Sequence, residues 1–126
     1  MGFFYIGDEA TDAVATNGDD VAVLLAGGEL DYAASPQLKE RLGESIDAGA
    51  RHLVLDLSMA TFIDSTAIGV LVGTVMRLRE DGGSLTIVCA EENQRVLRIF
   101  EIAGVDSLIT LHRSREEALS ALVLAG

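Results

Sequence analysis

The sequence predicts a small α/β domain whose sheet is mainly parallel, with one antiparallel strand on its N-terminal side and about four helices. Two observations lead to this prediction. From residue 21 onward, short apolar runs typical of strands alternate four times with helical patterns. Such alternation is typical of parallel strands joined by right-handed crossovers. Ahead of it, the turn sequence at 17–20 separates two apolar segments, which indicates an antiparallel hairpin.

The N-terminal part is expected to form the hairpin and the first helix. The hairpin is predicted from segments 11–16 and 21–26, and a turn is expected over 27–31. Ser35 is expected to cap the first helix, with Pro36 at its first position. The helix is predicted to end near Gly49, and its apolar positions recur at helical spacing at Leu38, Leu42 and Ile46.

The central part is expected to form two strands around a long helix. Residues 52–57 are a short apolar run, which favours a strand buried on both faces. The second helix is predicted from about Ser65 to Asp81, where Gly82-Gly83 follows. Residues 84–90 carry the β-branched and apolar content of another strand.

The last third is expected to contain two helices and a short strand. Asn93 is predicted to cap a helix that Gly104 ends, and its inward side chains are expected to be Val96, Leu97, Phe100 and Ile102. Residues 108–111 are expected to form a strand. Ser114 and Glu117 have the spacing of a capping box. They introduce a final helix with Ala118, Leu119 and Leu122 on its apolar side.

Composition limits the classes of function. The 126 residues suffice for one hydrophobic core, so we expect a single domain. Nine basic against twenty acidic residues give a formal net charge of −11, which repels nucleic acid and anionic lipid. Neither is an expected partner. The longest apolar stretch, 67–76, is shorter than the roughly 18 residues needed to span a bilayer, and no secretory signal is visible. With Cys89 as the only cysteine, a reducing cytoplasm is the expected location.

Catalytic motifs find little support. The sequence has neither a G-x-x-x-x-G-K-[ST] nor a G-x-G-x-x-G loop, and Ser65 is not in a G-x-S-x-G elbow. The two histidines, His52 and His112, are expected at strand ends. Two histidines are too few to form a three-ligand metal site by themselves. Cys89 is expected to be a buried, inert thiol. We therefore expect no enzyme activity, no cofactor and no metal.

The junction at Asp64-Ser65-Thr66 is the most informative feature. Asp64 is a good N-cap, which leaves the hydroxyls of Ser65 and Thr66 facing solvent in the first helical turn. A phosphate there would meet free backbone amides and bring about two negative charges. The residues alone leave two interpretations open, because serine is also common at helix starts without any regulatory role.

One side of the second helix differs from an ordinary solvated surface. The stripe predicted to face the core consists of Ile68, Leu71, Val72, Val75 and Leu78. The opposite stripe consists of Thr66, Val70, Gly73 and Arg77, three of which are small or apolar. This second stripe is expected either to receive a partner or to contact another part of the same domain.

Several segments in order resemble the signature of STAS domains, in particular bacterial anti-sigma factor antagonists. The strand 53–57 followed by Phe62-Ile-Asp-Ser-Thr-Ala-Ile-Gly-Val-Leu71 is similar to the central motif. Gly28-Glu-Leu-Asp31 resembles the family's Gly-Glu-Leu-Asp turn. Gly82-Gly83 and the segment 100–105 match in the expected places. The resemblance covers about 11–123, which implies one STAS domain over 1–126.

The resemblance implies a phosphorylation cycle without catalysis by this chain. The unphosphorylated form would bind an anti-sigma factor that is also a serine kinase, thereby releasing the sigma factor. Ser65 matches the phosphorylated serine of the family, with Thr66 as the alternative acceptor. A PP2C-type phosphatase would restore binding. The implied contact surface is Glu29, Asp31, Asp64, Ser65, Thr66, Ala67, Val70, Gly73 and Arg77.

One departure and two other functions stay open. Ala67 stands where the family commonly has glycine, which leaves the choice of kinase in doubt. The fold also occurs as a non-catalytic STAS module of a stress-signalling scaffold or of a lipid-transport assembly. A small-molecule or nucleotide binder is a third class, although no phosphate loop supports it.

Overall fold

The computed structural model describes residues 3–8 and 21–125. The elements follow the order β1 (Phe4–Asp8), β2 (Val21–Leu30), α1 (Ser35–Asp47), β3 (His52–Asp56), β4 (Ala60–Ile63), α2 (Ser65–Glu80), β5 (Ser84–Val88), α3 (Gln94–Ala103), β6 (Thr110–His112) and α4 (Arg115–Ala125). The mixed α/β class with an N-terminal antiparallel pair is confirmed.

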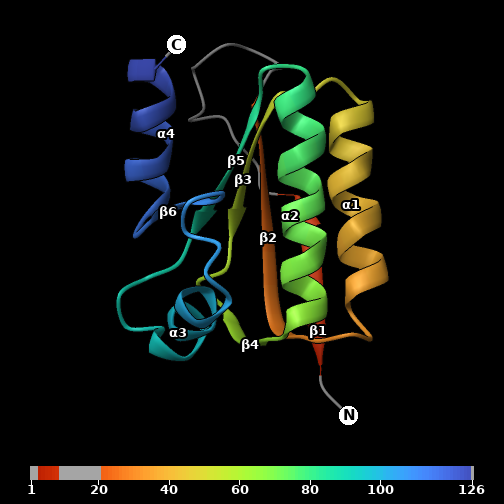
Figure 1. Ribbon diagram of the computed structural model, residues 1–126, viewed down its shortest axis with the longest axis vertical. Helices are drawn as coiled ribbons and strands as arrows, with labels where there is room; N and C mark the ends of the chain where they lie inside the picture. Colours follow the sequence, from red (N-terminus) through yellow and green to blue (C-terminus); the bar gives the residue numbers. More distant parts are fainter. Residues whose placement is uncertain (1–2, 9–20, 126) are drawn as a thin grey trace.

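The strands form one sheet in the order β1-β2-β3-β5-β6, and β4 pairs with the end of β2. Only β1 with β2 is antiparallel; the other pairings within the described residues are parallel. Because parallel strands all end at one edge, the starts of α1 and α2 meet at the carboxyl end of β2 and β4. Figure 1 shows α1 and α2 side by side over the sheet.

Two hydrophobic clusters lie on the two faces of the sheet because strand side chains alternate. Leu24 and Ala26 of β2 belong to the large cluster, which also contains apolar residues of α1, α2 and α3. Val21 and Val23 face the other way and pack with Ala118 of α4. Three helices thus cover one face, and α4 covers part of the other (Figure 1).

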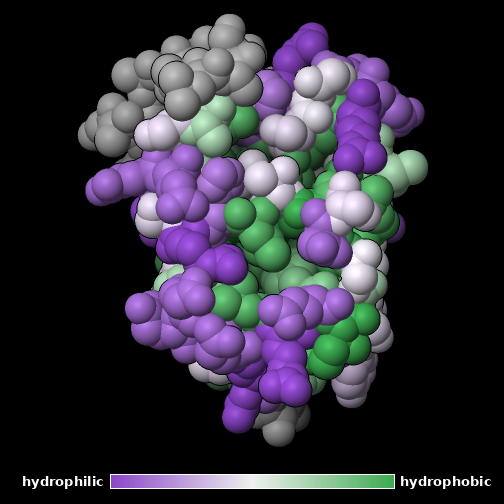
Figure 2. Space-filling view, turned by 60° about the vertical axis from the view of Figure 1, so that its left-hand side comes forward, coloured by the Kyte–Doolittle hydropathy of each residue, from purple (hydrophilic) through white to green (hydrophobic). Residues whose placement is uncertain are grey.

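The side of the molecule that carries α3 and α4 is not uniformly polar. Hydrophobic residues reach the surface in the middle of this side, between hydrophilic ones (Figure 2). Ile102 of α3 is one exposed apolar side chain, with 74% of its surface accessible. The prediction that it points inward was wrong, because two residues advance a helix by about 200° from the buried Phe100. Val96, Leu97 and Phe100 are buried as predicted.

The N-terminal half differs from expectation in three places. The antiparallel partner of β2 is β1, and the predicted strand 11–16 lies outside the described residues. Residues 27–30 belong to β2 rather than to a turn, since β1 and β4 pair with them. The strand β4 was not predicted, because its four residues show no clear alternation.

Some element ends differ by a residue or two. Ala34, not Ser35, is the N-cap of α1, because Asp31 forms the preceding turn and accepts from the Ala33 and Ala34 N–H groups at 3.0 and 3.2 Å. Strand β6 begins at Thr110 rather than at 108, and β5 ends at Val88 rather than at 90. The side chain of Asn93 makes no cap; its amide donates to the Ala60 carbonyl oxygen at 2.8 Å.

The other predicted helix ends are confirmed. Gly104 ends α3 in the left-handed region at φ 68°. Ser114 Oγ accepts from the Glu117 N–H at 3.1 Å, as a capping residue does. At the N-terminus of α2, Asp64 is the N-cap as expected. The start of α2 is therefore a local feature that the tertiary structure preserves.

Candidate functional site

The candidate site is the N-terminus of α2. Asp64 is in an extended conformation, and its carboxylate accepts from the Ala67 N–H at 3.0 Å. The Asp64 N–H in turn donates to the Leu30 carbonyl oxygen at 3.2 Å. The first hydrogen bond caps the helix, and the second joins the helix start to the end of β2. Ser65 and Thr66, the first two helical residues, are both exposed as predicted.

Ala67 is a correction to the predicted contact surface. It has no accessible surface and belongs to the core cluster under the helix. The reason is helical geometry, since Ala67 lies four residues before Leu71 and eight before Val75, on the buried face of α2. Its methyl group therefore cannot touch a docked partner. An effect of Ala67 on partner choice would have to act through the packing of the first turn.

The Gly-Glu-Leu-Asp segment lies beside this helix start. Glu29 is directly opposite Phe62 in the pairing of β2 with β4, and Leu30 is opposite Ile63. Glu29 is exposed, and Asp31 is half-buried because its carboxylate holds the turn into α1. The ends of β2 and β4, with Glu29, Asp31 and Asp64, thus lie at the same edge of the sheet as the start of α2.

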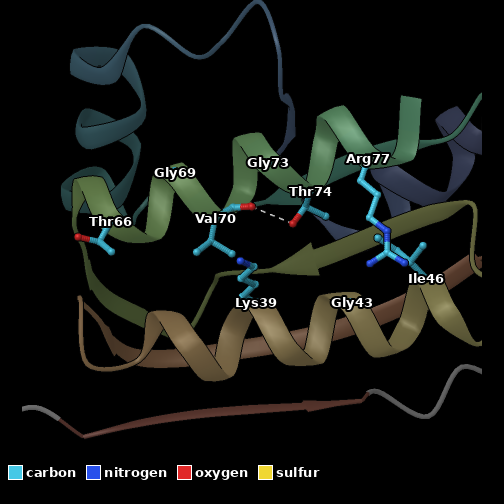
Figure 3. A pocket seen from close by; sticks show the side chains of 9 residues that line it. All are labelled: Lys39, Gly43, Ile46, Thr66, Gly69, Val70, Gly73, Thr74 and Arg77. Atoms are coloured by element: carbon cyan, nitrogen blue, oxygen red, sulfur yellow. Dashed lines mark hydrogen bonds between the residues drawn. The ribbon is translucent and has the colours of Figure 1, made fainter. Parts of the chain in front are cut away.

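The small-residue stripe of α2 faces a groove of about 400 Å³ between α1 and α2. Figure 3 shows Val70 and Lys39 pointing between the helices. A Cβ at Gly69 or Gly73 would have no other atom within 4 Å. Thr66 and Gly73 stay exposed, whereas Val70 is half-buried against the core. The stripe was expected either to receive a partner or to contact another part of the domain. Val70 and Arg77 contact other parts of the domain, whereas Thr66 and Gly73 remain open to a partner.

Arg77 closes one end of the groove. Its guanidinium donates to the Asp47 carboxylate at 2.5 Å, so its charge is already paired across the two helices. The guanidinium lies next to Gly43 on α1, where a Cβ would be at an ordinary contact distance of 3.5 Å from Arg77 Nη1. Arg77 is thus a bridge between α1 and α2 as well as a predicted contact residue.

The residues able to perform catalysis lie elsewhere. His52 begins β3, at the end of the sheet opposite Ser65, and its Nδ1 is 2.8 Å from Ser84 Oγ. His112 ends β6 and is 3.1 Å from the Glu117 carboxylate. Burial raises the pKa of Cys89 to about 11, so the thiol is protonated at neutral pH. No cluster of metal-ligating side chains occurs among residues 3–8 and 21–125.

Sequence reasoning missed an ion pair of a buried aspartate at the end of β3. The Asp56 side chain is 6% exposed and accepts from Arg115 Nε at 2.6 Å, which connects the sheet to the start of α4. Burial alone raises the pKa of Asp56, but hydrogen bonds from Ser58 and Arg115 outweigh it, so the pKa lies below its ordinary value. An aspartate inside an apolar strand was the signal for this pair.

Comparison with known proteins defines the class of protein. The family model described as the STAS domain matches residues 12–118. The chain belongs to the STAS domain family. Within that family it groups with the anti-sigma factor antagonists. The anti-sigma-B factor antagonist of Bacillus subtilis is 35% identical over 103 residues, which cover 82% of this chain and 91% of the relative.

Solved structures show the same fold at lower identity. An anti-sigma factor antagonist from Mycobacterium paratuberculosis superposes with a TM-score of 0.80 at 24% identity, covering 95% of this chain and 94% of that chain. The unphosphorylated form of the anti-sigma factor antagonist SpoIIAA superposes with a TM-score of 0.75 at 18% identity, covering 94% and 96%. Within the described residues, none of the helices is both long and apolar enough to cross a membrane.

Proposed function

We propose that this chain is a single, non-catalytic STAS domain that binds an anti-sigma factor with serine kinase activity and is switched off by phosphorylation of Ser65. The exposure of the Ser65 hydroxyl at a capped helix N-terminus supports this proposal most directly. The hydroxyl is accessible to a kinase. The Asp64 cap holds the first turn in one conformation.

The switch follows from charge. A phosphate on Ser65 adds about two negative charges next to Asp64, on a chain whose net charge is −11. In the kinase site, the transferred phosphate would also face the phosphates of the ADP left behind. Repulsion between these groups favours release of the antagonist. A PP2C-type phosphatase that removes the phosphate would restore binding.

The rest of the surface is compatible with a protein partner. The acidic charge disfavours nucleic acid and anionic membranes as ligands. The predicted contact residues Thr66, Val70 and Gly73 continue from Ser65 along α2 beside the groove. The cycle belongs in the cytoplasm, where ATP and sigma factors are found.

A kinase assay tests the proposal. The protein is incubated with ATP and purified anti-sigma factors of the histidine-kinase-like ATPase type from the same genome. We expect one phosphate on Ser65 in the wild type and in Thr66→Ala, and none in Ser65→Ala. Ser65→Asp should weaken binding at least tenfold, whereas Ser65→Ala should bind normally. The absence of modification, or unchanged binding by Ser65→Asp, would contradict the proposal and favour a STAS module without a kinase cycle.

A further inference from the structure

The outward side of α3 combines positive charge with apolar surface. At about 100° per residue, four side chains fall within roughly 100° of one another around this helix. They are Arg95, Arg98, Ile99 and Ile102, and we call them the α3 face. The three buried residues of the helix lie on the opposite side. The α3 face therefore points away from the core.

The apolar part of the α3 face is accessible. Ile102 has 74% of its surface exposed. Ile99 is half-buried and packs against the large core cluster, which anchors the face to the rest of the domain. Hydrophobic groups reach the surface between hydrophilic ones on the side of the molecule that carries α3 (Figure 2). A partner that covers these side chains gains free energy because apolar surface leaves water.

The two arginines of the α3 face have no internal partner. Their side chains make no hydrogen bond or ion pair with another residue in the described part of the chain. Four other arginines each form an ion pair with an aspartate or glutamate, namely Arg41, Arg77, Arg113 and Arg115. Glu101, the acidic residue of α3, lies about 100° around the helix from Ile102 and so outside the face. Both guanidinium groups are therefore available to an external carboxylate.

A groove of about 510 Å³ continues the α3 face at its N-terminal end. Arg95 lines this groove together with Met59, Ala60 and Ala90. Met59 is 61% exposed, so the groove offers apolar surface next to a guanidinium. Glu92 also lines the groove, and its charge favours an apolar group there over an acidic one. The groove can thus receive one apolar side chain of a partner.

We propose that the α3 face binds an acidic, amphipathic helix of a protein partner. Aliphatic side chains of that helix cover Ile99 and Ile102, and its carboxylates form bidentate pairs with Arg95 and Arg98. The face extends over seven residues of α3, a length of about 10 Å, which matches the i, i+3, i+7 spacing of a second helix lying alongside. Ser65 takes no part in this contact, so the inference does not rest on the proposed function.

Charge favours this occupant over three others. The net charge of −11 repels nucleic acid and anionic membranes, and it also repels a second copy of this chain. A nucleic acid backbone, moreover, offers no aliphatic group to cover Ile102. An acidic helix is repelled by most of this surface as well, but the α3 face offers it two cations beside apolar cover. Electrostatics therefore directs the helix to this face and contributes specificity more than affinity.

A titration with a defined peptide tests the inference. The probe is a helical peptide of about 15 residues that carries leucine at every third or fourth position and glutamate around this stripe. In methyl NMR spectra of the whole protein, the signals of Ile99 and Ile102 should shift more than those of the other isoleucines. A peptide with the same composition in scrambled order has no apolar stripe, and it should bind at least about fivefold more weakly.

Matched variants separate charge from apolar contact. Arg95→Gln and Arg98→Gln should each weaken peptide binding at least about threefold, whereas Lys39→Gln, which removes an exposed cation from α1, should change it less than about twofold. Ile102→Ser should weaken binding several-fold. Its control is Met76→Ser, which removes an exposed apolar side chain from α2 and should have little effect. Circular dichroism verifies that each variant is folded.

Three results would overturn the inference. The first is an unchanged Ile102 signal at millimolar peptide. The second is equal weakening by Arg98→Gln and Lys39→Gln, which would show that only net charge matters. The third is a wild-type dimer in sedimentation experiments that Ile102→Ser dissociates, which would identify a second copy as the occupant. None of these measurements involves Ser65, so failure of the proposed function would leave the inference standing, and the reverse also holds.

Discussion

The carboxylate of Asp64 accepts a hydrogen bond from the backbone N–H of Ala67 at 3.0 Å, and this contact caps α2 immediately before the exposed Ser65. Removing the cap in Asp64→Ala should lower the free energy of unfolding by about 1 kcal/mol, because the Ala67 N–H loses its acceptor. Asp64→Asn keeps a hydrogen-bond acceptor, so it should lower the free energy of unfolding by only a few tenths of the loss in Asp64→Ala. Denaturant unfolding measures both, and equal effects of the two variants would mean that capping is not the cause.

The buried pair of Asp56 and Arg115 should make stability depend on pH. The pKa of Asp56 lies below its ordinary value, so its contribution is complete above the unfolded pKa of about 4 and is lost as pH falls through the lower folded value. Asp56→Asn should therefore lower stability at pH 7 by roughly 1–3 kcal/mol, and by progressively less as the pH falls below about 4. Thermal unfolding of both proteins across this range tests the sign. A difference that does not shrink in acid would contradict it.

The single cysteine should be unreactive in the folded protein. Burial raises the pKa of Cys89 to about 11, so almost no thiolate exists at pH 8, and the side chain has no accessible surface. A chromogenic disulfide reagent should label less than about a tenth of the protein before unfolding and all of it in denaturant. Rapid labelling under native conditions would show that the strand end opens easily.

Gly28 should tolerate substitution far less well than Gly82. Both have similar positive φ angles, 77° and 75°, but a Cβ at Gly28 would lie 2.0 Å from backbone, whereas nothing lies within 4 Å at Gly82. Gly82→Ala should cost about 1 kcal/mol from the left-handed conformation alone. Gly28→Ala should cost at least about 3 kcal/mol, because β1 must move. Chemical unfolding measures both variants. Equal losses of unfolding free energy in Gly28→Ala and Gly82→Ala would show that β1 moves to accommodate the methyl group without an energetic cost.

The sequence alone predicted the features that depend on near neighbours. The α/β class, the Asp64 cap and the exposure of Ser65 all follow from patterns within one or two helical turns. Capping is such a local signal, because the side chain and the backbone groups that it binds are three residues apart. The buried stripe of α2 could also be predicted from the sequence, since helical spacing places Ile68, Leu71 and Val75 on one face.

Only the tertiary structure decided the features that depend on pairing between distant segments. Residues 27–30 are strand because β1 and β4 hydrogen-bond to them, and neither pairing can be seen in the local sequence. The same pairing places Phe3, Glu29 and Phe62 on neighbouring segments. The packing of α4 against the sheet places Arg115 against Asp56. Strand registry is set by the whole sheet, so the sequence by itself predicted an exposed Ser65 at the start of a helix, and the fold determined the surface around it.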